Sequence, residues 1–365
     1  MKITKVESFI IRTPIRRDIG DSTHMFTHWS TPGCWITTDE GLIGTGYTGL
    51  EGNGEELIKQ VIDQYYAPKL LGRDPFEVKR IWEELQWGRL HWIGRAGVTQ
   101  MALSAVDIAL WDIMAQAAGV PLWKLLGGDK PQAIKTYNTD GGWLNWTLDE
   151  LVTDTRRFVE QGWPGVKIKI GSADPWDDYR RVKAVREAIG DDILLMVDAN
   201  MVWDVNTACL WGKRLEEFHI HWLEEPLHPD DIAGHARLAR ELVTPIALGE
   251  NLYHRYSFRD YITTGAVEVV QADVTRVGGI TEWVRIANLA ACFNVPVVPH
   301  VGDMMQIQQH LVAATPNAPM LEYIPWILDL FEDPVVVERG HIKVPDRPGA
   351  STRMRSDSVE RWRVS

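Results

Sequence analysis

The sequence predicts an α/β protein in which a parallel (β/α) barrel follows a smaller α+β region. From about residue 133 onward, short apolar segments alternate with amphipathic helical segments, as successive βα units require. Before that point strands come first and helices afterwards, which is typical of an α+β domain. Several apolar segments also end in a charged residue, as barrel strands do where they carry a functional site.

The N-terminal part begins with strands and continues with helices. Segments 3–11 and 33–49 are expected to be extended, and the second contains the turn of a hairpin. Helical periodicity replaces this pattern between about residues 55 and 118. The polar segment 15–30 and the glycine-rich segment 46–54 are predicted to be long loops, and loops of this length are often lids over a site.

The apolar segments after residue 133 are spaced as the eight strands of one barrel. Amphipathic helices separate them, and in one of these helices Val182, Val185 and Ile189 share a face. An open doubly wound sheet is the alternative, but no glycine-rich phosphate-binding pattern follows any of the strands. The predicted strands are 133–138, 165–170, 193–200, 220–226, 245–251, 267–273, 295–300 and 320–325.

Composition limits the class of protein. The 365 residues are 45% hydrophobic and 24% charged, as in an ordinary globular protein, and the net charge of -12 argues against binding to nucleic acid. We find neither a signal-peptide core nor an apolar run of membrane-spanning length, so we expect no membrane association. Cys34, Cys209 and Cys292 cannot all pair, which fits a reducing compartment, and we predict a cytoplasmic protein.

Three consecutive predicted strands end in a carboxylate. Asp198, Glu224 and Glu250 are each 26 residues apart, which is about one βα unit. One such carboxylate is commonplace, but three would point into one small volume and repel each other unless a cation lay among them. Oxygen ligands without His or Cys suit a hard cation, so we predict Mg²⁺ at these residues, with zinc as the less suitable alternative.

Two lysines lie on the strand that precedes this series. Lys167 and Lys169, in the segment GVKIKIG, are two residues apart and therefore share one face of a strand. A wet edge strand would explain them equally well in isolation. Beside the three carboxylates they would face the cation site instead. A lysine close to another lysine and to Mg²⁺ should have a lowered pKa, which would make it a general base near neutral pH.

A second acid–base group follows from the later strands. Asp273 and His300 end consecutive strands, so that Asp273 could orient the imidazole of His300. His300 would then face Lys169 across the mouth of the barrel. Bases on both sides of a metal-bound carboxylate indicate removal of the proton α to that carboxylate, which gives an enediolate held by the metal.

Taken with the motifs SAVDIALWD, VKIKIG, DAN, EEP, GEN and VPDRPG, these residues resemble the enolase superfamily and its mandelate racemase-like subgroup over nearly the whole chain. The resemblance implies a modified (β/α)₇β barrel at residues 131–330. It also implies an α+β capping domain at residues 1–130 that the C-terminal segment 331–365 completes. A homo-oligomer, such as an octamer, is implied as well.

The resemblance also implies a role for each charged residue of the site. Asp198, Glu224 and Glu250 would bind Mg²⁺, and Asn200 would contact the substrate. Lys169 would be one base and the pair of Asp273 and His300 the other, while Lys167 would assist Lys169 and Glu322 would hydrogen-bond the enediolate. The implied catalytic residues are Lys167, Lys169, Asp273, His300 and Glu322.

Several reactions can start from an enediolate. We favour dehydration of a sugar acid, an aldonate or an aldarate, to a 2-keto-3-deoxy acid, because the polar segment 15–30 suits a polyhydroxylated small-molecule carboxylate. The first alternative is cycloisomerisation of an anhydrosugar acid or lactone, because GTGYT and residues 91–112 are similar to such enzymes. The others are racemisation or epimerisation of a 2-hydroxy acid, and a noncatalytic binding protein. The residues predicted to contact the substrate are Asn200, Arg16, His24, Trp29 and Trp326.

Overall fold

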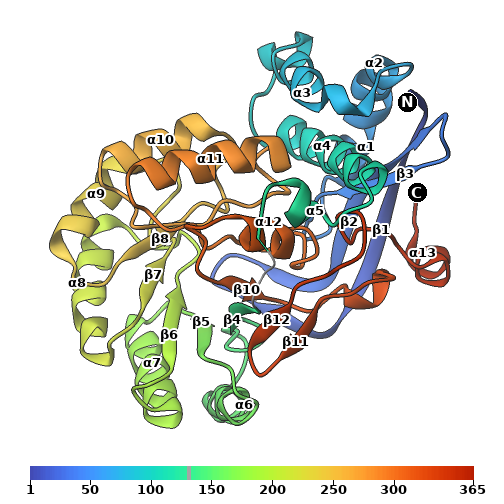
Figure 1. Cartoon of the computed structure of the whole chain (residues 1–365). Helices are drawn as coiled ribbons and strands as arrows, with labels where there is room; N and C mark the ends of the chain where they lie inside the picture. The colour runs from blue at the N-terminus through green and yellow to red at the C-terminus, as the bar shows by residue number, and fades with distance from the viewer. Residues whose placement is uncertain (130–132) are drawn as a thin grey trace.

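An antiparallel sheet of three strands begins the chain. β1 (Ile3–Gly20), β2 (Met25–Thr38) and β3 (Ile43–Tyr47) are neighbours in that order, and the expected turn joins β2 to β3. The computed structural model describes residues 1–129 and 133–365, and Figure 1 shows the sheet on the opposite side of the molecule from α8 and α9.

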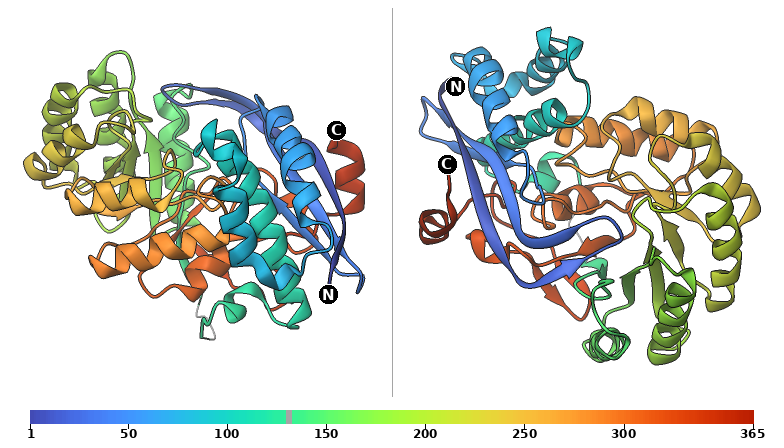
Figure 2. Two further views of the ribbon diagram at one scale, coloured as in Figure 1. Left: turned by 90° about the horizontal axis from the view of Figure 1, so that it is seen from above. Right: turned by 180° about the vertical axis from the view of Figure 1, so that it is seen from behind.

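The long loop predicted at residues 15–30 is instead the end of the β1–β2 hairpin, and this prediction was wrong. The pairing of the two strands is interrupted between Pro14 and Ile19 and then resumes as far as Gly20 and Met25. Ile19 and Phe26 are buried there in the main hydrophobic core, so two apolar residues inside a polar segment hold the strands together. Figure 2 shows this hairpin as a long, curved ribbon that reaches the barrel.

Helices cover one face of this sheet. α4 (Val98–Ala117) packs directly on β3, where a Cβ atom at Gly46 would lie 1.9 Å from the carbonyl oxygen of Ala105. By length and composition α4 could cross a membrane, but 78% of its most apolar window is buried inside the protein, which accounts for its hydrophobicity. The other helices of this part are α1 (Glu55–Val61), α2 (Ala67–Leu70), α3 (Val78–Gln86) and α5 (Leu122–Leu125).

Parallel strands form the barrel. Those from β4 to β9 pair in sequence order, and β10 pairs in parallel with the other edge of β4, which returns the sheet to its first strand. The strands are β4 (Ile134–Asn138), β5 (Gly165–Lys169), β6 (Leu194–Asp198), β7 (Trp222–Glu224), β8 (Ile246–Leu248), β9 (Val269–Val270) and β10 (Leu321–Tyr323).

One predicted strand is reduced to a single bridge. Within segment 295–300 only Val297 pairs, with Val270 of β9, because Pro296 and Pro299 have no N–H to donate to a ladder. This segment still occupies the seventh barrel position, so the predicted (β/α)₇β architecture is confirmed. The helices that follow the first seven positions are α6 (Leu148–Glu160), α7 (Pro175–Ile189), α8 (Val205–Leu215), α9 (Ile232–Glu241), α10 (Arg255–Thr263), α11 (Ile280–Cys292) and α12 (Gln308–Ala314).

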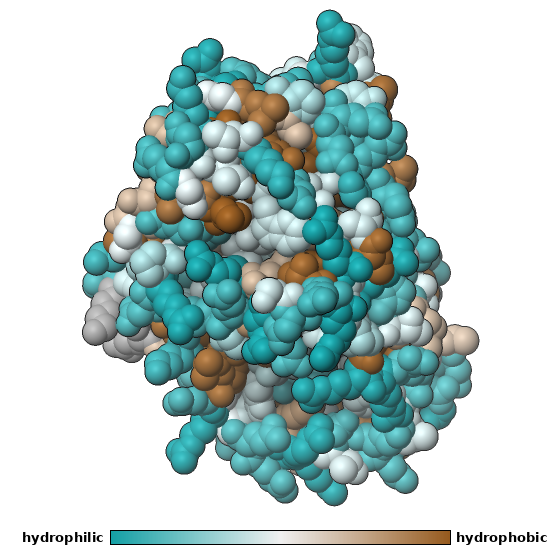
Figure 3. Space-filling view, turned by 90° about the vertical axis from the view of Figure 1, so that its right-hand side faces the viewer, coloured by the Kyte–Doolittle hydropathy of each residue, from teal (hydrophilic) through white to brown (hydrophobic). Residues whose placement is uncertain are grey.

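The C-terminal segment contacts both parts of the molecule. The hairpin of β11 (Val336–Glu338) and β12 (His341–Lys343) adds antiparallel to β4, whereas α13 (Ser356–Trp362) packs on β1. The segment therefore extends the barrel sheet through β12, and it joins the N-terminal sheet by a single bridge between Arg363 and Ile11. The boundary predicted between residues 130 and 131 lies outside the described residues. On the side that carries α13, hydrophobic residues form separate small groups on a mostly hydrophilic surface (Figure 3).

Candidate active site

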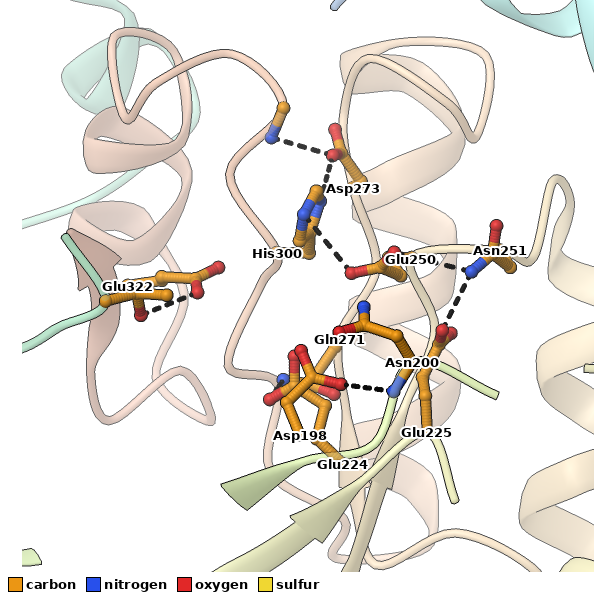
Figure 4. Close-up of polar contacts among 12 residues, drawn as sticks. Asp198, Asn200, Glu224, Glu225, Glu250, Asn251, Gln271, Asp273, His300 and Glu322 are labelled. Atoms are coloured by element: carbon orange, nitrogen blue, oxygen red, sulfur yellow. Dashed lines mark hydrogen bonds and ion pairs between the residues drawn. The ribbon is translucent and has the colours of Figure 1, made fainter. Parts of the chain in front are cut away.

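Three carboxylates meet at the carboxyl ends of neighbouring strands. Asp198 ends β6 and is paired in register with Glu224, which ends β7, and Glu250 lies two residues beyond β8. One oxygen of each lies within 4.8 Å of the others, and the three side chains converge in Figure 4. Burial raises the pKa of Glu224 although Lys167 lowers it, so a cation beside this carboxylate would favour its ionised form. The donor set and its burial fit a hard divalent cation such as Mg²⁺.

The two lysines of β5 are the counter-charges of this group. Lys169 is paired in register with Asp198, and its Nζ lies 2.6 Å from Asp198 Oδ2. Lys167 Nζ lies 2.5 Å from Glu224 Oε1 and 2.6 Å from Glu322 Oε1. Both lysines are buried, so the face of the strand that carries them is not wet. The alternative of an edge strand with solvated lysines is therefore wrong.

Among the charged side chains of the protein, the pKa of Lys169 is raised, whereas the sequence analysis expected it to be lowered by Lys167 and Mg²⁺. Burial disfavours its ammonium form and Lys167 lowers its pKa further, but the Asp198 carboxylate raises it, and the net shift is upward. The sequence argument considered the cations and left out the carboxylate that lies in contact. A divalent cation on Asp198 would offset this effect by withdrawing the negative charge from Lys169.

The second acid–base group is fixed by hydrogen bonds. His300 Nδ1 lies 2.6 Å from Asp273 Oδ2, which also accepts a hydrogen bond from the backbone N–H of Gly302 (2.8 Å). The Oδ1 atom of Asp273 accepts two hydrogen bonds of 2.7 Å, from the backbone N–H and the hydroxyl of Thr275. His300 Nε2 lies 3.2 Å from Glu250 Oε2 (Figure 4). Although burial lowers the pKa of His300, Glu250 and Asp273 raise it to about 9.

Glu322 of β10 is fixed at one oxygen and free at the other. Its Oε1 accepts a hydrogen bond from Thr139 (2.8 Å) and pairs with Lys167. Its Oε2 is buried and has no hydrogen-bond partner among the described residues. Burial raises the pKa of Glu322, but the Lys167 ammonium lowers it below its usual range, so the carboxylate is ionised. An ionised carboxylate accepts hydrogen bonds and cannot donate one.

A cavity lies above these groups, between the barrel and the β1–β2 hairpin. The predicted substrate residue Asn200 lines it, and its Oδ1 is buried without a partner in the described part of the chain. Arg16 does not line the cavity and is exposed on the hairpin. The other residues predicted from the sequence that line it are Lys167, Lys169, Glu250, His300, Glu322, His24, Trp29 and Trp326.

Some residues of the site were missed by the sequence analysis. Glu225 follows Glu224 directly, and strand alternation would place it on the opposite face, but its φ of 38° turns the chain so that its side chain is also buried here. It accepts a hydrogen bond from Asn251 (2.8 Å), as Figure 4 shows. The motif EEP contained this signal. The other missed residues, all of which line the cavity, are Asp21, Glu51, Thr139, Trp143 and Arg276.

A (β/α)₇β barrel with a carboxylate triad between a lysine and a histidine–aspartate pair defines an enzyme of the enolase type. Comparison with protein families agrees with this class. Residues 150–358 match the family described as enolase C-terminal domain-like, and residues 30–127 match the mandelate racemase / muconate lactonizing enzyme N-terminal domain. The chain belongs to the mandelate racemase-like subgroup of the enolase superfamily.

Known relatives cover almost the whole chain. L-talarate/galactarate dehydratase of Salmonella typhimurium is 39% identical over 90% of this chain and 81% of its own length. 3,6-anhydro-alpha-L-galactonate cycloisomerase of Streptomyces coelicolor is 36% identical over 95% of both proteins. The crystal structure of L-talarate dehydratase from Polaromonas sp. JS666, complexed with Mg and L-glucarate, superimposes with a TM-score of 0.92 at 34% identity and covers 100% of this chain and 98% of its own.

Proposed function

We propose that the protein is a Mg²⁺-dependent dehydratase that converts a sugar acid to a 2-keto-3-deoxy acid. The observation that carries this proposal is the placement of Lys169 and His300 on one buried cavity, next to three converging carboxylates. Relatives named as sugar-acid dehydratases support the choice of substrate class.

Asp198, Glu224 and Glu250 hold the metal in this proposal. Bound Mg²⁺ would stabilise the negative charge that develops on the substrate carboxylate when its α-carbon loses a proton. The related L-talarate dehydratase structure with Mg and L-glucarate supports the assignment of the metal. Lys167 compensates the negative charge of Glu224 and Glu322 by its contacts with both carboxylates.

Two side chains move protons. Lys169, as the neutral amine, or His300 removes the α-proton, so that the C–H electron pair forms the enediolate. His300 then gives a proton from Nε2 to the hydroxyl at C3, whose C–O bond breaks as water leaves. The enol that remains becomes the 2-keto-3-deoxy acid by taking up a proton at C3 and losing the proton of its C2 hydroxyl. Asp273 accepts a hydrogen bond at 2.6 Å from Nδ1 of His300, so the transfer uses Nε2, which lies 3.2 Å from Glu250 Oε2.

The remaining polar groups orient the substrate. The ionised Glu322 carboxylate accepts a hydrogen bond from a substrate hydroxyl at Oε2, which has no partner within the described residues. Asn200 accepts another at Oδ1, which likewise has none in the described part of the chain. His24, Trp29 and Trp326 line the opposite, hairpin side of the cavity and contact the remainder of the sugar.

Cycloisomerisation of an anhydrosugar acid or lactone is the second candidate. The relative named 3,6-anhydro-alpha-L-galactonate cycloisomerase supports it, because the 36% identity extends over 95% of both chains. The same two bases would remove the α-proton, and a ring oxygen would leave in place of water. Epimerisation would use both bases and return the proton to the opposite face.

Product analysis tests the proposal. The protein with Mg²⁺ is incubated with a panel of sugar acids, anhydrosugar acids and lactones, and semicarbazide is used to detect 2-keto-3-deoxy acids. Dehydration predicts a semicarbazone together with loss of one water by mass. An isomeric product of unchanged mass would establish the cycloisomerase or epimerase instead. Absence of any product and of any α-proton exchange would leave only the noncatalytic binding protein.

We also propose that the protein acts in the cytoplasm as a homo-oligomer. The cysteine content and the resemblance to the superfamily support this proposal. Light scattering on the purified protein measures its mass, and a value close to the 41.5 kDa of one chain would contradict it.

A further inference from the structure

The hairpin end of the cavity is acidic. Asp21 lies at the tip between β1 and β2, Glu51 follows β3, and both line the cavity. His24 lies between them, with Nδ1 at 3.4 Å from Asp21 Oδ1 and Nε2 at 3.3 Å from Glu51 Oε2. Arg276, the other cation near this end, donates a hydrogen bond of 3.0 Å to the backbone carbonyl of Glu250. Two carboxylates therefore share one imidazole and the guanidinium of Arg276. Burial raises the pKa of Glu51, and the charges of His24 and Arg276 lower it.

One oxygen of Asp21 is free to accept a hydrogen bond. The side chain is 4% exposed, and its Oδ1 accepts hydrogen bonds from the backbone N–H groups of Thr23 and His24, both of 2.7 Å. Its Oδ2 accepts none from residues 1–129 or 133–365. Burial raises the pKa of Asp21, but His24 and Lys169 lower it to about 2, so the carboxylate carries a full negative charge.

The indole N–H of Trp29, elsewhere on the cavity lining, is a donor that needs an acceptor. Trp29 also lines the cavity, is 3% exposed, and has an indole N–H without a partner in the described chain. A second carboxylate on the substrate could accept from Trp29 but would meet the charges of Asp21 and Glu51. An ammonium group could donate to Asp21 but could not accept from Trp29. The hydroxyls along a sugar chain can serve both residues, because each hydroxyl has one donor and two acceptor sites.

We propose that the substrate carries a single carboxylate and a neutral, hydroxylated tail, so that the enzyme acts on aldonates in preference to aldarates. This inference rests on the proposed function, which uses the one carboxylate at the metal end of the cavity. The tail places its hydroxyls against Asp21, Glu51 and Trp29. The two carboxylates act as a filter, because like charges in a closed site oppose binding of the wrong substrate.

The first test compares pairs of acids of the same configuration, such as gluconate with glucarate and galactonate with galactarate. The kcat/KM values are measured with the intact protein and Mg²⁺. We expect the best aldonate to exceed its aldarate by about tenfold or more, as expected for one unfavourable charge contact. Equal or better use of the aldarate would overturn the inference. Better use of an analogue with an amino group at the far end of the chain would overturn it as well.

The second test removes the charges. Asp21→Asn and Glu51→Gln each remove one negative charge and keep an oxygen that can accept a hydrogen bond. Each variant should raise the ratio of the aldarate kcat/KM to the aldonate kcat/KM by about tenfold. Asp18→Asn is the matched control, because Asp18 is exposed on the same hairpin and does not line the cavity. A purely structural role would change both substrates equally. An unchanged ratio in both variants would contradict the filter, and a folding defect in one variant leaves the other to decide.

Exchange of the α-proton in D₂O separates this inference from the proposed function. Exchange with aldonates and little with aldarates supports both. Exchange that favours aldarates overturns only the inference on the tail. If no acid of either kind exchanges, the proposed function fails, and the inference fails with it.

Discussion

The barrel end and the hairpin end of the cavity are built differently. At the barrel end Lys167 and Lys169 contact carboxylates at 2.5 to 2.6 Å and are almost fully buried. At the hairpin end His24 is 41% exposed and lies 3.3 to 3.4 Å from its two carboxylates. The barrel groups are thus positioned before the substrate arrives, as proton transfer requires, while the hairpin groups keep unpartnered atoms for recognition.

Hydrogen bonds join the two ends. Ser22 Oγ at the hairpin tip donates to the carbonyl oxygen of Ala199 at 2.8 Å, and the backbone of Gly20 pairs with that of Leu144 at 2.8 Å. Ala199 lies between the predicted metal ligand Asp198 and Asn200. The hairpin is therefore fixed to the barrel at its own tip. Changes at the barrel end should affect kcat most strongly, and changes at the hairpin end should affect the choice of substrate.

Removal of the metal should have the largest effect. Dialysis against EDTA should reduce turnover to background, because the three carboxylates lose the cation that the substrate carboxylate needs. Addition of Mg²⁺ should restore activity, and circular dichroism should show that the fold is retained in between. Full turnover after chelation would contradict the metal site.

Replacement of either proton carrier should have the next largest effect. Lys169→Ala and His300→Asn should each lower kcat by about 10² to 10⁴, which is the usual contribution of a general acid or base. Lys183→Ala, on the exposed face of α7, is the control for loss of a lysine. Steady-state kinetics measures the effect, and wild-type turnover in both site variants would disprove the roles of these residues.

Asp273→Asn should have a smaller effect than loss of His300. The amide can still contact Nδ1 at the position where the carboxylate lies 2.6 Å away, but it no longer raises the pKa of His300. We expect a loss in kcat of about 10- to 100-fold, as for other partners that orient a functional histidine. The pH dependence of kcat should also shift, because the imidazolium of His300 loses its proton at a lower pH. An unshifted profile would indicate that Asp273 does not act through His300.

Trp326→Phe should produce the smallest effect. Trp326 Nε1 donates to Asp140 Oδ1 at 3.1 Å on the hairpin side of the cavity, and phenylalanine keeps the aromatic ring but loses this donor. We expect KM to rise by about 2- to 10-fold with kcat nearly unchanged, which corresponds to one hydrogen bond. Arg16→Ala, outside the cavity, should leave both constants unchanged. A larger fall in kcat for Trp326→Phe than for Asp273→Asn would contradict the division between the two ends.

The barrel end was predictable from the sequence because it depends on local rules. Parallel strands bring their carboxyl ends to one edge, so Asp198 and Glu224, each the last residue of its strand, had to lie together. Lys169 follows from the same register with Asp198. Strand alternation could not place Glu225, because a single positive φ after Glu224 reverses its side.

The hairpin end was not predictable for a different reason. Its strands are held by the burial of Ile19 and Phe26, which lie far from any regular apolar pattern and pack only when the hairpin meets the barrel. Asp21 and Glu51 are brought together by His24 through contacts between separate segments, and spacing along the chain contains no sign of this. Tertiary packing, rather than local propensity, decides this region.

Exchange of the substrate α-proton is the most direct test of the central account. The protein, Lys169→Ala and His300→Asn are each incubated with Mg²⁺ and sugar acids in D₂O, and ¹H NMR follows the signal at C2. We predict exchange or turnover by the unaltered protein and a large loss of α-proton removal in at least one of the variants. If both variants removed the α-proton at the wild-type rate, neither residue would be the base, and the account of this site would be wrong.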